Sequence, residues 1–177
     1  MAITLIALVL LLVAAAAMLR AVDTSGILAG NLAFRRDLAN RSESAIVTAR
    51  AALTSGTLGT DTARTANSAE AHYSATRLPS SSGVPTVLAN DSAYTAAGYG
   101  SATADKVTLR WVIDRQCASG TVAFSTATCE YVSSSGDAAG SNWLHKPNGG
   151  TRPVYRISVR VTGPRDTEAY FQSTFVN

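Results

Sequence analysis

Side chains that could perform chemistry are few in this chain, and their spacing matches no reaction site. The two histidines, His72 and His145, stand alone, and a lone histidine in a polar loop is usually a solvated side chain. Serines are abundant, but no GxSxG, HExxH, GxxxxGKS/T or GxGxxG motif selects one of them or predicts a metal or nucleotide site. Asp105 and Asp166 fit a strand end and a turn better than a catalytic pair of carboxylates. We therefore expect a protein that is not an enzyme, without catalytic residues, cofactor or metal.

The cysteines, Cys117 and Cys129, lie twelve residues apart. Two free thiols, half of a metal site and one disulfide are all compatible with such a pair. No CxxC motif or histidine cluster accompanies it, so a zinc site is not indicated. In an exported domain two cysteines most simply form a disulfide, and closing so short a loop stabilises the fold by about 3 kcal/mol. We expect a Cys117–Cys129 disulfide.

The charge of the chain is low and evenly spread. Only 15% of the 177 residues are charged, and the net charge is +3. Apart from Arg35-Arg36 the basic residues stand singly, without a run of five or six, so nucleic acid binding is not indicated. Aromatic residues in predicted loops, Tyr94, Tyr99 and Trp143, are either partner-contact residues or covers of a small core.

The first nineteen residues are almost entirely apolar. Met1 to Leu19 contains one polar side chain, Thr4, before Arg20 ends the run. About 18 apolar residues are enough to cross a bilayer as a helix, which satisfies its own backbone hydrogen bonds in lipid. A secretory signal peptide would carry a basic residue ahead of a shorter apolar core. No basic residue precedes Arg20 and helical periodicity continues beyond it, so a retained helix is favoured over a cleaved signal.

The helix is expected to continue to residue 54. Apolar residues from Val22 to Leu53 recur at spacings of three, four and seven with charges between them, as in an amphipathic helix. Ser55-Gly56 is a stop signal. The predicted organisation is an apolar segment for a membrane or a hydrophobic assembly (1–19), an amphipathic half (20–54) and a globular head (55–177).

Two glycines, Gly26 and Gly30, lie within this helix. Each costs up to about 1 kcal/mol relative to alanine. They are either tolerated residues, or a GxxxG packing face or flexible point. The sequence alone leaves both interpretations open.

Two parts of the head alternate as β-strands do. Lys106 to Arg115 places apolar residues on one face, which predicts a half-buried strand. Segments 155–162 and 169–176 alternate on either side of a Gly163-Pro164-Arg165-Asp166 turn, which predicts an antiparallel hairpin. A short helix is expected within Asp61–Ala75, in a region otherwise read as surface loops.

A short strand pair held by the disulfide is expected between residues 117 and 131. An isolated hairpin is only marginally stable, so the apolar face of the predicted hairpin needs a partner. The long helix supplies one. The predicted fold class is α+β, a long N-terminal spine helix packed on a small antiparallel sheet with one disulfide.

These features together resemble a type IV pilin, and the residues are most similar to the PilX-type minor pilins. The resemblance lies in the apolar run ending in Met18-Leu19-Arg20, the AGN-x-x-F segment Ala29–Phe34 and the Ala-rich stretch Ser44–Leu53. It extends to the strand Trp111–Cys117 and to YR-x-x-VRVTGPR-x-T in Tyr155–Thr167, so that about half of the chain is covered. The resemblance implies a pilin fold and a non-enzymatic, structural role in type IV pilus assembly.

The resemblance also gives roles to N-terminal residues. Met1 is the position that the family's peptidase N-methylates after removing a short leader, so we expect the numbering to begin at the mature N-terminus. Leu5 stands where most pilins carry Glu, a residue thought to pair with the terminal amine of a neighbouring subunit. PilX-type pilins and the K-type pseudopilins of type II secretion often lack that Glu. A subunit at the filament tip has no subunit above it whose terminal amine would need that Glu. Leu5 therefore favours a tip or priming subunit.

The partners that the resemblance implies are other pilins and minor pilins, the inner membrane before assembly, and a PilY-type tip adhesin. The implied location is the bacterial inner membrane, with the head in the periplasm, and later the extracellular pilus. Three alternatives stay open: a minor pseudopilin of type II secretion, a major pilin, and a membrane-anchored periplasmic domain with binding or hydrolytic activity.

Overall fold

The computed structural model describes residues 2–118, 123–133 and 150–176. The chain divides into two compact units, Met1–Ala39 and Asn40–Asn177. One helix, α1 (Ala2–Thr54), forms all of the described first unit and the first element of the second. The first unit is therefore purely helical, and the α+β fold belongs to the second.

Helix α1 runs without interruption to Thr54, as the periodicity predicts. At 1.5 Å per residue its 53 residues extend over roughly 80 Å. The helix ends at the expected stop, where the N–H groups of Ser55 and Gly56 both donate to the Ala51 carbonyl, at 3.0 and 2.9 Å. A Cβ on Gly56 would lie 2.8 Å from the Cα of Ala52, so this close turn requires glycine.

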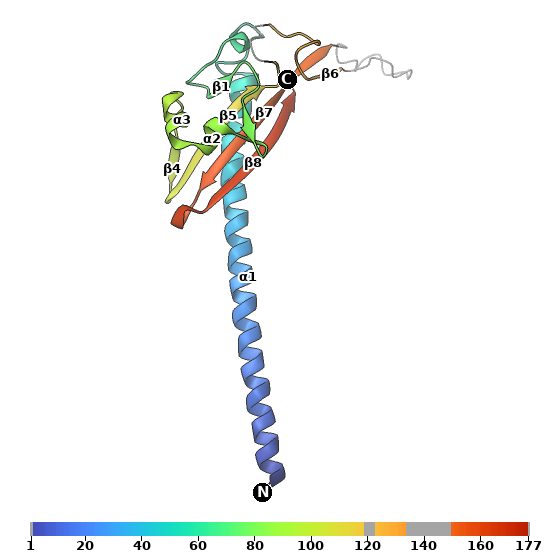
Figure 1. Ribbon diagram of the computed structural model, residues 1–177, viewed down its shortest axis with the longest axis vertical. Coiled ribbons are helices and arrows are strands. Elements are labelled where there is room, and N and C mark those ends of the chain that lie inside the picture. The colour runs from blue at the N-terminus through green and yellow to red at the C-terminus, as the bar shows by residue number, and fades with distance from the viewer. Residues whose placement is uncertain (1, 119–122, 134–149, 177) are drawn as a thin grey trace, which may run out of the picture. The chain divides into compact units, whose positions relative to one another are not determined.

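The second unit contains a six-stranded sheet (Figure 1). Strand β5 (Val107–Arg115) pairs with β7 (Thr151–Thr162), and the other edge of β7 pairs with β8 (Glu168–Val176). These three strands are antiparallel, so the predicted strand and the predicted hairpin are confirmed. The short strands β4 (Ala102–Ala104) and β6 (Tyr131–Ser133) are also antiparallel to their neighbours.

The sheet is mixed, so the prediction of an antiparallel sheet is wrong at one edge. Strand β1 (Tyr73–Ser74) pairs in parallel with β5, with Tyr73 opposite Ile113. The Ile113 N–H donates to the His72 carbonyl at 2.8 Å. A strand of two residues is too short to produce a periodic signal, so the sequence pattern contained no trace of it.

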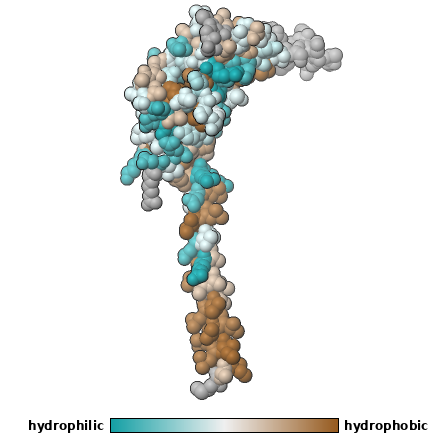
Figure 2. All heavy atoms as spheres, in the orientation of Figure 1, coloured by the Kyte–Doolittle hydropathy of each residue, from teal (hydrophilic) through white to brown (hydrophobic). Residues whose placement is uncertain are grey.

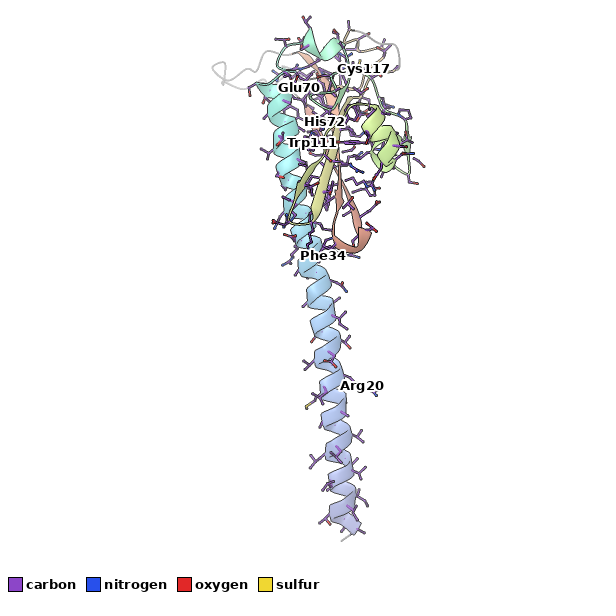
Figure 3. All side chains as sticks on the ribbon, turned by 90° about the vertical axis from the view of Figure 1, so that its left-hand side faces the viewer. Arg20, Phe34, Glu70, His72, Trp111 and Cys117 are labelled. Carbon is purple, nitrogen blue, oxygen red and sulfur yellow. A yellow bond between two sulfur atoms is a disulfide. The ribbon has the colours of Figure 1, made fainter. Side chains whose placement is uncertain are left out.

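Helices cover the sheet of the second unit on both faces (Figure 3). Helices α2 (Thr86–Ala89) and α3 (Asp91–Ala96) lie on one face, where a buried cluster contains Leu88, Tyr94 and Val112. The part of α1 after Asn40 lies on the other face and buries residues spaced three or four apart: Ser42, Ala45, Ile46, Ala49 and Leu53.

Strand β5 is consequently buried more deeply than alternation predicts. Val112, Ile113 and Asp114 are successive residues, and each is 0% exposed. Successive side chains of a strand point to opposite faces, so this burial requires cover on both. The predicted half-buried strand is a central strand, and a carboxylate lies inside it.

The segment after α1 does not form the short helix predicted within Asp61–Ala75. It contains a single 3-10 turn, Ala63–Thr65, before β1. The Asn67 side-chain oxygen accepts from the Ala75 N–H at 2.9 Å, and the buried Tyr73 hydroxyl donates to the Arg64 carbonyl at 2.8 Å. Such side-chain bonds to backbone groups compete with the helical pattern and favour a loop.

A second small hairpin lies in the region read as surface loops. Strands β2 (Ser80–Ser81) and β3 (Val84–Pro85) pair around Ser82 and Gly83, whose φ angles are 52° and 83°. Two consecutive left-handed residues are typical of a two-residue type I′ turn. The Gln172 side-chain amide donates to the Gly83 carbonyl at 3.3 Å and links this hairpin to β8.

The predicted Cys117–Cys129 disulfide is present. The two cysteines also form an isolated antiparallel bridge, and the Glu130 N–H donates to the Gln116 carbonyl at 2.8 Å. The disulfide therefore closes a short ladder just beyond the end of β5, close to the strand pair that the sequence predicts.

Candidate functional site

The N-terminal part of α1 presents a continuous apolar surface (Figure 2). Its most apolar stretch of 18 residues contains no buried residue. Large side chains there range from 53% exposed at Val9 to 82% at Ile3. By length and composition this helix is able to cross a membrane. An exposed apolar surface of this extent marks a contact with lipid or with another protein.

Two N-terminal positions were assigned roles from the sequence. Leu5 is 65% exposed and belongs to the apolar surface of α1, where a Glu would place a carboxylate. Together with Ile6, Val9 and Leu10 it lines a shallow apolar hollow on the helix. Met1, the expected site of N-methylation, lies outside the described residues.

Helix α1 shows no break at Gly26 or Gly30. Apart from its chain neighbours and the helix backbone within four residues, a Cβ added at either position would meet no atom of the described chain within 4 Å. Packing inside this chain therefore does not explain the two glycines. Close packing against another molecule and simple tolerance remain as explanations, and local melting on assembly stays a prediction.

Two hydroxyl side chains near these glycines are satisfied by the helix itself. The Thr24 hydroxyl donates to the Arg20 carbonyl at 2.9 Å, and the Ser25 hydroxyl donates to the Val22 carbonyl at 2.8 Å. Hydroxyls bonded back to their own helix need no water. This part of α1 can therefore enter an apolar environment without leaving those hydroxyls unpaired.

A buried arginine in the second unit fixes the C-terminal end of α1. The Arg64 side chain donates from Nη2 to the Leu53 carbonyl at 2.8 Å and from Nε to the Leu58 carbonyl at 2.7 Å. Its Nη1 donates to Asp61 at 3.0 Å. The last carbonyls of a helix have no partner within it, and a cation is favourable there. Arg64, which is 5% exposed, supplies both a hydrogen-bond donor and a positive charge at this helix end.

The deepest ion pair joins Asp114 of β5 to Arg156 of β7. Asp114 accepts from Arg156 Nε at 2.9 Å and from Nη2 at 2.6 Å. It also accepts from the Leu78 N–H at 3.0 Å and from the Gln116 side-chain amide at 2.9 Å. A buried carboxylate is tolerated when it is fully hydrogen-bonded, and four donors meet that condition here. The pair ties two strands to the segment that precedes β2.

A second charged cluster attaches α3 to the sheet. Arg110 of β5 and Arg160 of β7 lie directly opposite each other, and both donate to Asp91 at the start of α3. The hydrogen bond from Arg110, followed by that from Arg160, lowers the pKa of Asp91. Arg160 also forms an ion pair with Glu168 of β8. The cluster of two arginines and two carboxylates therefore links three strands and a helix.

His72 belongs to a buried aromatic cluster (Figure 3). Its ring centroid lies 4.4 Å from that of Trp111, and its Nε2 accepts from the Gly100 N–H at 3.0 Å. The Tyr94 hydroxyl accepts from the Trp111 N–H at 3.2 Å and donates to the Gly100 carbonyl at 2.9 Å. Burial lowers the pKa of His72, although a hydrogen bond to the backbone of Trp111 opposes that shift. The ring is thus a neutral component of the core.

The aromatic residues considered as partner contacts lie in different settings. Tyr94 is 1% exposed, so a partner-contact role is wrong for this residue. Tyr99 is half-buried and packs against the same cluster, with its ring centroid 5.4 Å from that of Tyr94. Trp143 lies outside the described residues. Two of the three therefore cover the small core.

Comparison of the chain with protein-family models, curated proteins and solved structures gives no match. Over the described residues, no three His, Cys, Asp or Glu side chains gather in a way that could hold a metal ion. The function is therefore inferred from the chain itself. It has an exposed apolar helix and a head fixed by a disulfide, a helix cap and two charged clusters.

The structural roles of Arg64 and Asp114 were not predicted from the sequence. Arg64 follows the helix stop by eight residues and resembles any loop arginine. Asp114 had a faint signal, because an acidic residue directly after Val112 and Ile113 interrupts a strongly apolar strand. Neither position could be assigned a partner, because the partner of each lies in a different element of the fold.

Proposed function

We propose that this chain is a structural minor pilin that acts in the assembly of a type IV pilus, within a priming or tip complex. One observation carries the proposal. An exposed apolar segment is continuous with a helix whose last residues are built into a disulfide-bonded α+β head. The resemblance of both ends of the chain to PilX-type minor pilins supports the same role.

In this proposal the apolar segment works in two places. It first holds the subunit in the inner membrane and then enters the helical core of the filament. Large apolar side chains avoid water in both settings, so the transfer costs little, and specificity comes from packing. The self-satisfied hydroxyls of Thr24 and Ser25 are compatible with either environment.

Leu5 gives the proposed subunit its position. An ionised carboxylate in an apolar environment is costly without a partner. A subunit with no neighbour above it has no terminal amine to pair with, so a leucine is the better residue there. We therefore place this subunit at the tip, with Met1 N-methylated like the first residue of other pilins.

The head would contact other pilins and a PilY-type adhesin from the extracellular end of the filament. Such a role requires a head that keeps its shape while the apolar helix moves from lipid to protein. The Arg64 cap, the Cys117–Cys129 disulfide and the buried Asp114–Arg156 pair supply internal restraints of that kind. The subunit would reside in the inner membrane before assembly and in the pilus afterwards.

A charge placed in the apolar segment tests this function in the producing bacterium. Leu8→Arg should prevent retention in the membrane and incorporation into sheared filaments, because a charge at the centre of a bilayer costs about 2.5–3.5 kcal/mol or more. Val132→Arg, at a 49% exposed position of the head, is the matched control and should be incorporated normally. Incorporation of Leu8→Arg at the wild-type level would contradict the proposal.

A further inference from the structure

A hollow in the second unit is lined by arginines. Its volume is about 470 Å³, within the range of small-molecule sites. Arg64, Arg115 and Arg152 all line it. Among the described lining residues, Asp61 alone is acidic. Three arginines and one acidic residue therefore line the hollow, and its walls carry a net positive charge.

The carboxylate does little to neutralise this hollow. The Asp61 side chain is 98% exposed and already accepts from Arg64 at 3.0 Å. Arg64 and Arg115, by contrast, are only 5% and 2% exposed. Positive charge held against low-dielectric walls produces a stronger local potential than the same charge in water. The hollow therefore attracts anions.

Arg152 is the arginine best placed to bind such an anion. It lies at the beginning of β7, opposite Val132 of β6, and it is exposed. Arg64 and Arg115 use donors on backbone carbonyls, for example Arg115 Nε on the Ala75 carbonyl at 2.9 Å. An exposed guanidinium can present two parallel N–H groups to a carboxylate or phosphate.

The remaining walls suit the body of an organic molecule. Phe124, Pro153 and Tyr155 contribute ring surfaces to the hollow. Arg64 lies over the Tyr155 ring, with its central carbon 5.8 Å from the ring centroid. Burial raises the pKa of Tyr155, so its hydroxyl keeps the proton that it could donate to an anion. The hollow thus combines a cationic side with aromatic surface.

We infer that this hollow binds a small organic anion of about monosaccharide size, with its carboxylate or phosphate on Arg152 and its ring against Phe124 and Tyr155. The site lies wholly in the second unit, and the inference does not depend on a role in pilus assembly.

Calorimetric titration of the full chain in a nonionic detergent tests this inference. Galacturonate and glucose 6-phosphate are the probes, and galactose and inorganic phosphate are the controls. We expect at least one of the two acids to bind more tightly than galactose and more tightly than inorganic phosphate. Arg152→Gln should weaken that binding about tenfold or more, the scale of a charge-assisted hydrogen bond. Arg35→Gln, at an exposed arginine of α1, should leave it unchanged.

Several results would overturn the inference. One is that neither acid binds, and one is that galactose binds equally well. Another is that inorganic phosphate binds as tightly as the acids, which would remove the role of the ring surfaces. The last is an equal loss of affinity in Arg35→Gln and Arg152→Gln. Arg152 is exposed, so its replacement should not unfold the head, and an unchanged circular dichroism spectrum confirms this for each variant.

Discussion

Replacing Asp114 by asparagine should destabilise the head far more than the same change at Asp105. Asp114 is 0% exposed and accepts four hydrogen bonds, two of them from the Arg156 guanidinium. The Asp105 side chain is 79% exposed and lies 3.4 Å from Arg41. The two variants therefore make the same chemical change in a buried and in an exposed ion pair.

The magnitude follows from the hydrogen bonds of the carboxylate. An asparagine keeps one acceptor oxygen, but its NH₂ group would face a donor of Arg156, and the guanidinium, whose side chain is only 13% exposed, would lose its counter-charge. Each hydrogen bond to a charged group contributes about 1.5–3 kcal/mol, and breaking a buried pair from one side costs about 3–5 kcal/mol. We expect Asp114→Asn to lower the free energy of unfolding by about 3–5 kcal/mol.

The control, Asp105→Asn, should have little effect on the free energy of unfolding. An exposed ion pair contributes about 0–1 kcal/mol. Asp105 has a φ of 51°, and asparagine is among the residues that tolerate this left-handed conformation. Asp105→Asn should therefore change the free energy of unfolding by less than about 1 kcal/mol.

Urea unfolding of the full chain in detergent measures both changes. Near-ultraviolet circular dichroism and tryptophan fluorescence report on the aromatic core around Trp111, and the midpoints give the difference in free energy. At about 2–4 °C per kcal/mol, Asp114→Asn should also lower the melting temperature by roughly 6–20 °C. Equal destabilisation of the two variants would refute the reasoning, because it would mean that the Asp114 carboxylate is not held in a dry ion pair.

Three further predictions concern the same head. Burial lowers the pKa of His72 from 6.5, so the folded chain binds fewer protons than the unfolded chain below that pH. The contribution of His72 to stability should be constant above about pH 6.5 and fall as the pH drops from there towards the lowered pKa. His72→Gln should remove this part of the pH dependence, and an NMR titration of the ring at or above 6.5 would contradict the prediction. Replacing Cys117 and Cys129 by alanine should cost about 3 kcal/mol, and a wild-type urea midpoint unaffected by a reductant would show that the disulfide contributes nothing. Arg64→Met should cost at least about 2 kcal/mol, because two buried carbonyls lose a charged donor, and hydrogen exchange at the Gly56 amide should accelerate; unchanged exchange there would exclude a capping role.

The long periodic elements could be predicted because local patterns determine them. Helix α1 and the β7–β8 hairpin each extend over many residues, so apolar residues repeat often enough for the period to be recognised. The stop at Ser55-Gly56 was predictable for the same local reason, because glycine commonly follows the last turn of a helix. The structure adds that a Cβ on Gly56 would meet that turn. The disulfide followed from two cysteines in a chain with an export-like N-terminus.

The short and long-range features could not be predicted from local pattern. Strand β1 has two residues, and its parallel pairing with β5 depends on where the chain returns after α1. Asp114 and Arg156 lie 42 residues apart and meet only because β5 and β7 are neighbours. The burial of Asp114 likewise depends on helices that cover both faces of the sheet. The sequence of a strand does not show which elements will cover its two faces.

Mass spectrometry of sheared surface filaments tests the proposed function most directly. The measurement quantifies this chain against the most abundant pilin and reads its N-terminal peptide. The proposal predicts a low ratio, a methylated Met1 and an intact apolar helix. Equimolar abundance would make this chain a major subunit despite Leu5. Absence from the filaments, or a mature chain that begins near Met18, would contradict the pilin proposal itself.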